Sequence, residues 1–331
     1  MSAPLLIVGQ GVAGTMLAWQ LEQAGVDFRI VDAGHAQATS RIAGGLVNPV
    51  TGLRLAKSWQ AEELLPLARE SYLALGAAIG ASVWRDVRIR RLFRGASERA
   101  LFERRRTEGD LGPFLGASDE EGFWIEGAGC VDLPALLAAA RARWKDLGIL
   151  EERRFTDADW GTPAIHCTGA SVRALTPLVG VPWQVSRGEL LTVEAAGLDP
   201  GVVLSRVHWV LPVEGNRARV GASYSRDTDA SRPTDTARTI LGRSASDLLG
   251  RPFSVIDHEA GLRLALPDKR PLAGWIPGRT DVGVCTALGS KGVLWAPWLA
   301  RQWRRCLCAG EPFDPEVAIE RRLAKPVSAN G

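Results

Sequence analysis

The chain has 331 residues, 46% of them hydrophobic and 23% charged, which is ordinary for a globular protein long enough for roughly two domains. Its 40 Lys and Arg and 37 Asp and Glu residues give a net charge of +3. This near balance argues against nucleic acid or a membrane surface as a partner. No apolar run has the length of a membrane span, and the first strand leaves no room for a signal peptide, so we expect a cytoplasmic protein.

The cysteines and histidines give no sign of a metal site, and we predict none. The five cysteines are an odd number without paired spacing, which indicates reduced thiols. Cys306 and Cys308 have too few possible partners for a zinc site. His166 lies inside an apolar run, so we interpret it as a packed core residue and not as a catalytic one.

The opening of the chain has the pattern of a dinucleotide-binding unit. Leu5–Val8 is a short apolar run typical of a buried strand. Gly9–Gly14 then fits G-x-G-x-x-G and leads into residues with helical apolar spacing. Phe28–Val31 predicts a second strand, and Asp32 stands at its end, about 20 residues beyond the turn. The complete strand–turn–helix–strand with its acid favours a dinucleotide site over a plain tight turn.

Each residue type in this motif has a physical role. Gly9 permits the tight turn, Gly11 lets a pyrophosphate approach the backbone, and Gly14 allows close packing of helix against strand. The free N–H groups and positive dipole end of the helix favour phosphate. The Asp32 carboxylate is placed to accept hydrogen bonds from ribose hydroxyls.

Elements of both types are predicted along the rest of the chain. The stretch 39–49 is short of helix formers, and its Gly44-Gly45 pair allows a flat or charged group to lie against the backbone; an ordinary loop is the alternative. Residues 183–225 form short runs of strand-forming residues broken by Gly, Pro and Asn. This pattern indicates an antiparallel sheet, with strands at Gln184–Val193, Val202–Pro212 and Arg217–Tyr224. Further strands are predicted at 87–93, 123–126, 164–167 and 282–287, and helices at 59–79, 97–108, 132–147, 234–249 and 289–308.

One predicted helix carries three consecutive arginines, Arg104, Arg105 and Arg106. A nucleic-acid patch is one interpretation. Glu103 and Glu108 are interspersed with the arginines, however, which favours a solvated and ion-paired helix face.

The ordered set of motifs resembles the FAD-dependent D-amino-acid oxidase and glycine oxidase superfamily along almost the whole chain. Each landmark is modest alone, but all occur in family order. They are Gly9/Gly11/Gly14 with an acid after strand two, Ser40…Gly44-Gly45…Pro49, Val131-Asp132…Pro134, Ala164…Thr168-Gly169-Ala170, Arg187-Gly188, Gly221-Ala222-Ser223-Tyr224, Gly261-x-Arg263…Pro267-Asp268 and Gly289-x-x-Gly292.

The resemblance implies an α/β fold, in which a Rossmann-like FAD-binding domain is interleaved with a substrate domain built on a mainly antiparallel sheet with helices. The FAD-binding domain would be discontinuous and comprise 1–85, 130–178 and 256–325. The substrate domain would comprise 86–129 and 179–255, with a flexible tail at 326–331.

The resemblance also implies FAD as cofactor and oxidation of a C–N bond in a small amine or amino acid, by hydride transfer to flavin. Arg263 matches the arginine that grips the substrate carboxylate, which suits its bidentate fork; a structural arginine is the alternative. Tyr224, Trp209 and Lys291 are pocket candidates, though either aromatic could be a packed sheet residue. The expected cofactor-binding residues are Gly9, Gly11, Val12, Ala13, Gly14, Asp32, Ser40, Arg41, Gly44, Gly45, Leu46, Thr168, Gly169, Gly289, Ser290, Lys291, Gly292 and Val293.

The sequence departs from the family pattern at two places. The acid after strand two is Asp32, where Glu is commoner. Members that act on amino acids often have His and Arg before the last helix, where this chain has Leu288 and Ser290. Lys291 could replace the missing anchor and add positive charge at the start of that helix, or it could point to solvent.

The expected partners are a small amine or amino-acid substrate and an electron acceptor, which is O₂ for an oxidase. The oligomeric state stays open. A dehydrogenase of the same fold that uses another acceptor is one alternative. A flavin domain acting on a modified nucleoside in RNA, disfavoured by the charge balance, is another. A non-catalytic flavin-binding redox module is the third, and the substrate-domain landmarks argue against it.

Overall fold

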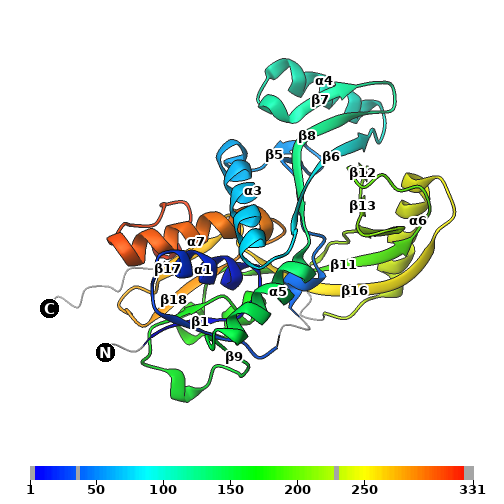
Figure 1. The fold of residues 1–331 in the computed structure, drawn as a ribbon. Coiled ribbons are helices and arrows are strands. Elements are labelled where there is room, and N and C mark those ends of the chain that lie inside the picture. Colours follow the sequence, from blue (N-terminus) through cyan, green and yellow to red (C-terminus); the bar gives the residue numbers. More distant parts are fainter. Residues whose placement is uncertain (1–3, 35–37, 227–230, 324–331) are drawn as a thin grey trace.

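A computed structural model describes residues 4–34, 38–226 and 231–323 (Figure 1). Its strands form a six-stranded sheet, a ten-stranded sheet and a short hairpin of β4 (Val50–Thr51) and β5 (Ala56–Lys57). The predicted fold class, a Rossmann-like unit joined to a mainly antiparallel sheet, is confirmed. The predicted tail, 326–331, lies outside the described residues.

The smaller sheet contains the strands of the opening motif. Strand β1 (Leu5–Val8) pairs in parallel with β2 (Phe28–Val31) on one side and β10 (Ala164–His166) on the other, while β17 (Leu272–Trp275) runs antiparallel to β18 (Val282–Thr286). Every residue of β1 is buried, as expected for a continuous apolar strand inside a parallel sheet. The order across the sheet is β17 (Leu272–Trp275), β18 (Val282–Thr286), β10 (Ala164–His166), β1 (Leu5–Val8), β2 (Phe28–Val31) and β9 (Leu150–Glu151).

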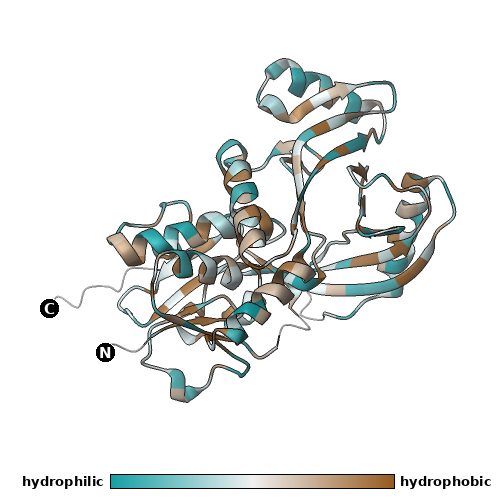
Figure 2. Ribbon diagram, in the orientation of Figure 1, coloured by the Kyte–Doolittle hydropathy of each residue, from teal (hydrophilic) through white to brown (hydrophobic). Residues whose placement is uncertain are grey.

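Three of the described helices pack beside this sheet, and a fourth packs against one of them. Helix α1 (Val12–Gln23) contacts α7 (Gly292–Ala309) and α5 (Leu133–Asp146), and α3 (Ala61–Ala78) contacts α7 (Figure 1). Their buried faces and the strands carry much of the hydrophobic colour in Figure 2. The described 3₁₀ turns are at Gly112–Phe114, Asp157–Asp159, Gly169–Ala174, Thr176–Leu178 and Ile319–Arg321.

The larger sheet extends away from the parallel one. Helix α6 (Asp235–Leu249) packs on β11 (Gln184–Glu194) and β13 (Trp209–Pro212). Helix α4 (Ala96–Glu108) lies at the far end, beyond β6 (Trp84–Leu92) and β8 (Gly122–Val131) (Figure 1). The strand order is β15 (Ser225–Arg226), β11 (Gln184–Glu194), β14 (Arg217–Gly221), β13 (Trp209–Pro212), β12 (Val202–Ser205), β6 (Trp84–Leu92), β8 (Gly122–Val131) and β3 (Leu46–Val47), with β16 (Ser254–Ala265) on β11 and β7 (Leu115–Ser118) on β8.

The structure corrects several predicted elements. The run Val202–Pro212 is two strands, β12 and β13, which turn back on each other and pair Leu204 with Val210. The strand predicted at Arg217–Tyr224 is shorter than predicted and ends at Gly221. The stretch 39–49 contains a short helix, α2 (Thr39–Ile42), and β3. Strand β16, which was not predicted, spans the expected domain boundary at 256, and the division into two domains stays a prediction.

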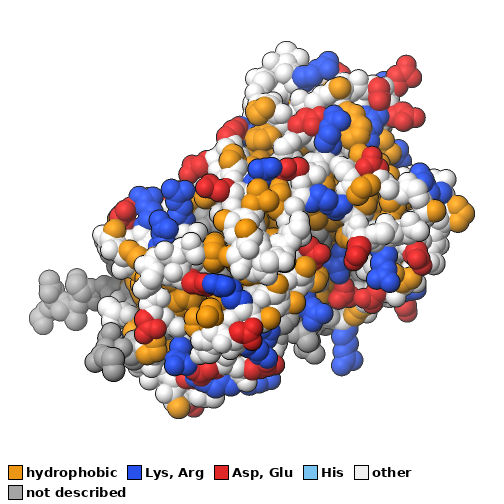
Figure 3. All heavy atoms as spheres, viewed as in Figure 1, with side chains coloured by type: hydrophobic (Ala, Val, Ile, Leu, Met, Phe, Trp, Pro, Cys, Tyr) orange, Lys and Arg blue, Asp and Glu red, His pale blue; other side chains and the backbone are white. Residues whose placement is uncertain are grey.

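Two other sequence interpretations, those of His166 and of helix α4, are confirmed. His166 is buried and packs edge-on against Phe155, with ring centroids 5.0 Å apart, and burial lowers its pKa to about 4. Glu103 and Glu108 pair with the arginines of α4, as predicted, and the face in Figure 3 mixes both signs of charge. All five cysteines are free. No described helix is long and apolar enough to cross a membrane.

Candidate functional site

A cavity of about 400 Å³ is bordered by residues of both sheets. Gly11 borders it from the β1–α1 turn and Gly292 from the start of α7, so two segments far apart in the sequence meet here. Gly188 of β11, Trp209 of β13 and Arg263 of β16 border it from the larger sheet. The cavity therefore joins the predicted dinucleotide motif to the antiparallel strands.

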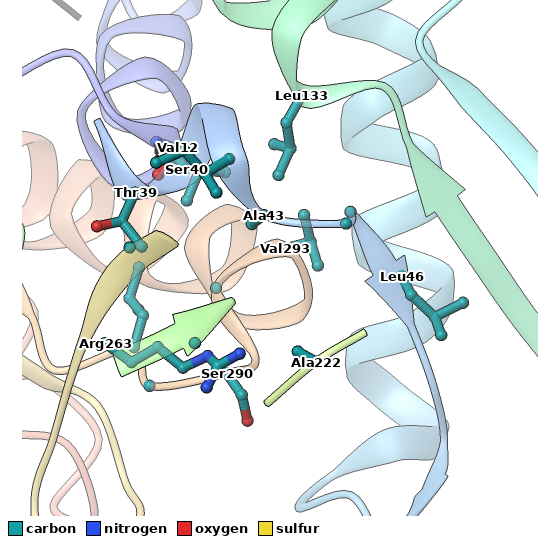
Figure 4. A pocket seen from close by; sticks show the side chains of 18 of the residues that line it. Val12, Thr39, Ser40, Ala43, Leu46, Leu133, Ala222, Arg263, Ser290 and Val293 are labelled. Atoms are coloured by element: carbon teal, nitrogen blue, oxygen red, sulfur yellow. Dashed lines mark hydrogen bonds between the residues drawn. The ribbon is translucent and has the colours of Figure 1, made fainter. Parts of the chain in front are cut away.

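The glycine turn is as tight as its motif predicts. Gly9 has a left-handed φ of 97°, and a Cβ on Gly14 would lie 1.9 Å from the carbonyl oxygen of Gly9. No side chain but glycine fits at position 14, so α1 starts directly against β1. The N–H of Val12 donates to Oγ of Ser40 at 3.1 Å, and both residues border the cavity (Figure 4). The positive end of α1 thus faces the cavity.

The segment around Gly44 and Gly45 forms one wall of the cavity. Gly45 has a φ of 72°, and a Cβ there would lie 1.9 Å from the carbonyl oxygen of Val131. A Cβ on Gly44 would lie 2.4 Å from the indole of Trp209. This segment is therefore held between β8 and β13, and its backbone faces the cavity.

The Arg263 guanidinium lies over Gly188, whose missing side chain provides the space. A Cβ on Gly188 would lie 2.0 Å from Nη2 of Arg263. Nη1 donates to the carbonyl oxygen of Ser223 at 3.2 Å, and burial lowers the arginine pKa. Arg263 forms no ion pair with a carboxylate of the described residues. In Figure 4 its side chain extends toward Ser290 and Ala222. A half-buried cation that borders a cavity and has no carboxylate partner among the described residues is suited to an anionic ligand.

Two of the predicted pocket residues, Lys291 and Tyr224, do not border the cavity. Nζ of Lys291 donates to Oγ of Ser58 at 2.5 Å and to Oγ1 of Thr51 at 3.2 Å, and Lys291 does not border the cavity. Burial, with a smaller effect of Arg270, lowers the lysine pKa to about 8. Tyr224 is 54% exposed, and its ring centre lies 5.8 Å from Cζ of Arg263.

Most of the predicted cofactor-binding residues border the one cavity. Those that do are Gly11, Val12, Ala13, Ser40, Gly44, Gly45, Leu46, Gly169, Gly289, Ser290, Gly292 and Val293. Those that do not are Gly9, Gly14, Asp32, Arg41, Thr168 and Lys291. Gly9 and Gly14 shape the turn, and Asp32 lies at the end of β2. Binding of the cofactor by each residue stays a prediction.

Sequence reasoning missed a part of the lining. Gly188 and Leu190 border the cavity from alternate positions of β11, a two-residue spacing that could have been read from the sequence. Arg91, Cys167 and Cys285 gave no such signal. Their positions depend on strand pairings between distant segments, because β12 pairs with β6 and β10 pairs with β18.

The cavity fits a dinucleotide with a flat ring system. At one end it offers the N-terminus of α1, which suits a pyrophosphate. Along its wall it offers the close-packed backbone of Gly44 and Gly45, against which a planar ring can lie. At the side of Arg263 it offers a positive charge. These features agree with the FAD that the sequence predicts.

Comparison with known proteins supports the same family. The glycine oxidase of Pseudomonas aeruginosa is 24% identical and aligns over 95% of this chain and 98% of its own. The tRNA 5-methylaminomethyl-2-thiouridine biosynthesis bifunctional protein of Azoarcus sp. is 25% identical over 94% of this chain, which spans 58% of that relative.

Solved structures have the same fold. Glycine oxidase from Geobacillus kaustophilus superposes with a TM-score of 0.78 at 20% identity and covers 95% of this chain and 96% of its own. Iminodiacetate oxidase from Chelativorans superposes with a TM-score of 0.77 at 20% identity and covers 96% of this chain and 98% of its own. The model of the FAD-dependent oxidoreductase family matches residues 5–303, so the chain belongs to that family and is a flavoprotein enzyme.

Proposed function

We propose that this enzyme oxidises the C–N bond of a small amino acid or amine, and that its preferred substrates carry a carboxylate. The observation that carries this proposal is Arg263, a half-buried guanidinium bordering the cavity without a carboxylate partner among the described residues. A substrate carboxylate would supply that partner through two charge-assisted hydrogen bonds. The names of the glycine oxidase and iminodiacetate oxidase relatives support the same class of substrate.

The chain would hold FAD along the cavity. The N-terminus of α1 and Ser40 would face the pyrophosphate, and the Gly44-Gly45 backbone would face the ring. Bound FAD would supply the hydride acceptor, so no nucleophile or metal ion is required of the protein. The contribution of Arg263 would be orientation, because holding the reacting carbon at about 3–3.5 Å in line is worth several orders of magnitude in rate.

The experiment that tests this proposal is anaerobic reduction of the purified holoenzyme. Glycine, sarcosine, D- and L-amino acids and simple amines are added in turn, and loss of the flavin absorbance is recorded. We expect bleaching by at least one amino acid, and slower bleaching by the matching amine without a carboxylate. Equal rates for both would remove Arg263 from substrate binding, and no bleaching by any compound would favour a non-catalytic flavin module.

The electron acceptor is tested with the same substrate. Peroxide formed under air is compared with dye reduction without air. We propose an oxidase, which produces peroxide in proportion to substrate. Dye reduction without peroxide would instead identify the dehydrogenase alternative. The fold is shared with both kinds of enzyme, since L-proline dehydrogenase from P. horikoshii superposes with a TM-score of 0.72.

A further inference from the structure

The carboxylate of Asp32 contacts three separate parts of the chain. Its Oδ1 accepts hydrogen bonds from the N–H of Gly34 at 3.0 Å and from Nη1 of Arg141 at 2.9 Å. Its Oδ2 accepts one from the N–H of Gln10 at 2.8 Å. An ionised carboxylate has about four acceptor positions. Three are occupied here, and the open one is on Oδ2.

Arg141 comes from α5, far from the glycine motif in sequence. Its side chain is 8% exposed, and that of Asp32 is 11% exposed. Nη1 of Arg141 also donates to Oε1 of Gln10 at 2.8 Å, and the amide of Gln10 donates to the carbonyl oxygen of Leu137 at 3.0 Å. Gln10 is completely buried. These bonds fasten the glycine turn and the end of β2 to one face of α5.

Among the described residues, Arg141 is the one charged partner of the Asp32 carboxylate, beside two backbone N–H groups. Asp is one methylene shorter than the commoner Glu and reaches less far toward a ribose, so its orientation matters more. Without Arg141, Oδ1 would keep only the Gly34 N–H, and a nearly buried anion would lose its cation. Such an anion is disfavoured, and the two backbone N–H groups alone would hold the carboxylate less firmly.

We propose that Arg141 is a positioning residue for the adenosine end of FAD. By occupying Oδ1 of Asp32, it leaves Oδ2 as the oxygen that accepts a hydrogen bond from a ribose hydroxyl. Arg141 thereby sets how tightly the enzyme retains FAD. This inference does not depend on which substrate is oxidised.

The test is the dissociation constant of FAD, measured by quenching of flavin fluorescence as apoprotein is titrated. We expect Arg141→Met to raise this constant about 10- to 100-fold. Arg141→Lys, which keeps the positive charge but not the planar guanidinium with its several N–H donors, should give a smaller increase. The matched control is Arg143→Met. Arg143 lies on the same helix and pairs with Glu22, without contact to Asp32, so this variant should stay within about twofold of the wild type.

A double variant separates positioning from general packing. If Arg141 acts through Asp32, Asp32→Asn combined with Arg141→Met should bind FAD about as tightly as Asp32→Asn alone. If the double variant instead raised the dissociation constant of FAD by the product of the two single-variant increases, Arg141 would act independently of Asp32, and the proposal would be overturned. Wild-type affinity in folded Arg141→Met would also overturn it. Circular dichroism of the apoprotein reports folding, and Arg141→Gln, a milder removal of the charge, allows the same comparison if Arg141→Met does not fold.

Discussion

The guanidinium of Arg263 and the backbone of Gly188 occupy one shared space. Strands β11 and β16 pair Ser186 with Arg263 and Gly188 with Gly261, so Arg263 and Gly188 are diagonal neighbours on one face of the ladder. A Cβ on Gly188 would lie 2.0 Å from Nη2 of Arg263. The glycine of the Arg187-Gly188 landmark is therefore needed for space, and a side chain there excludes the observed position of Arg263.

Gly188→Ala should accordingly damage substrate binding and leave FAD in place. The methyl group would displace the guanidinium, and we expect KM for a carboxylate substrate to rise about tenfold or more, the usual effect of misplacing a binding group. Steady-state kinetics and the flavin content of the purified variant test this. Gly242→Ala is the control, because a Cβ on Gly242, inside α6, meets nothing within 4 Å. Unchanged KM in Gly188→Ala would show that Arg263 does not contact substrate.

Arg263→Met should remove the carboxylate anchor itself. We expect kcat/KM for a carboxylate substrate to fall by about 2–4 kcal/mol in transition-state terms, with FAD content unchanged. A carboxylate-free amine should lose much less, because it never forms the ion pair. The ratio of the two losses is the measurement. Equal losses for both substrates would assign Arg263 a structural role.

The parts of the fold set by local sequence could be predicted closely. Asp132 accepts a hydrogen bond from the N–H of Ala135 at 2.9 Å, and Pro134 occupies the first turn, so helix α5 begins where its cap residues indicate. The glycine turn of the opening motif was equally clear. Both features depend on interactions between residues a few positions apart.

Features set by distant pairing could not be predicted in this way. Strand β16 has exposed Ile256 and half-buried Arg263, so its alternation is weak, and its formation depends on pairing with β11. The turn between β12 and β13 consists of Arg206, Val207 and His208. It contains no Gly, Pro or Asn, so the sequence gives no signal of a turn there. The direction of Lys291 depends on Thr51 and Ser58, both remote in sequence.

Arg219 should support the cavity wall from behind. Its Nη1 donates to the carbonyl oxygens of Ile42 at 2.8 Å and Ala43 at 3.1 Å, and its Nη2 pairs with Glu259. Arg219→Met removes these bonds just before Gly44. We expect a loss of about 1.5–3 kcal/mol in stability for bonds to a charged group, and weaker FAD binding. Urea unfolding and flavin titration test this against exposed Arg217→Met on the same strand, which should change neither. Wild-type FAD affinity in Arg219→Met would contradict the supporting role.

Lys291 should make stability depend on pH above neutrality. Its pKa is lowered from 10.5 to about 8 in the folded chain, so between these values the unfolded chain binds more protons and stability rises with pH. Relative to Lys291→Met, the wild type should therefore gain stability from about pH 8 to about pH 10.5. Urea unfolding of both proteins at pH 7, 9 and 10 measures the difference. Lys57→Met, at a lysine paired with Glu62 on the surface, is the control, and a pH-independent gap for Lys291→Met would contradict this prediction.

Glu98 should anchor the outer part of the larger sheet, beside the cavity. Its side chain is 1% exposed and accepts from Nη2 of Arg91 at 2.6 Å and from Nε of Arg94 at 2.9 Å. Burial alone would raise its pKa, but the hydrogen bonds and charges of the two arginines outweigh burial and lower it. Because the folded pKa lies below the ordinary 4.5, the stabilisation is complete above that value and is lost as pH falls through the folded pKa.

Glu98→Gln should therefore cost about 3–5 kcal/mol at pH 7, since it leaves two arginines facing a neutral side chain, one of them buried. The cost should shrink as the pH falls below about 4.5, where the wild type loses its own carboxylate charge. Urea unfolding at pH 7 and at successively lower pH measures both effects. Glu103→Gln, an exposed change on the same helix, should stay within about 0.5 kcal/mol. A cost for Glu98→Gln that does not change with pH would mean that packing, and not the charge of Glu98, holds α4 against β6.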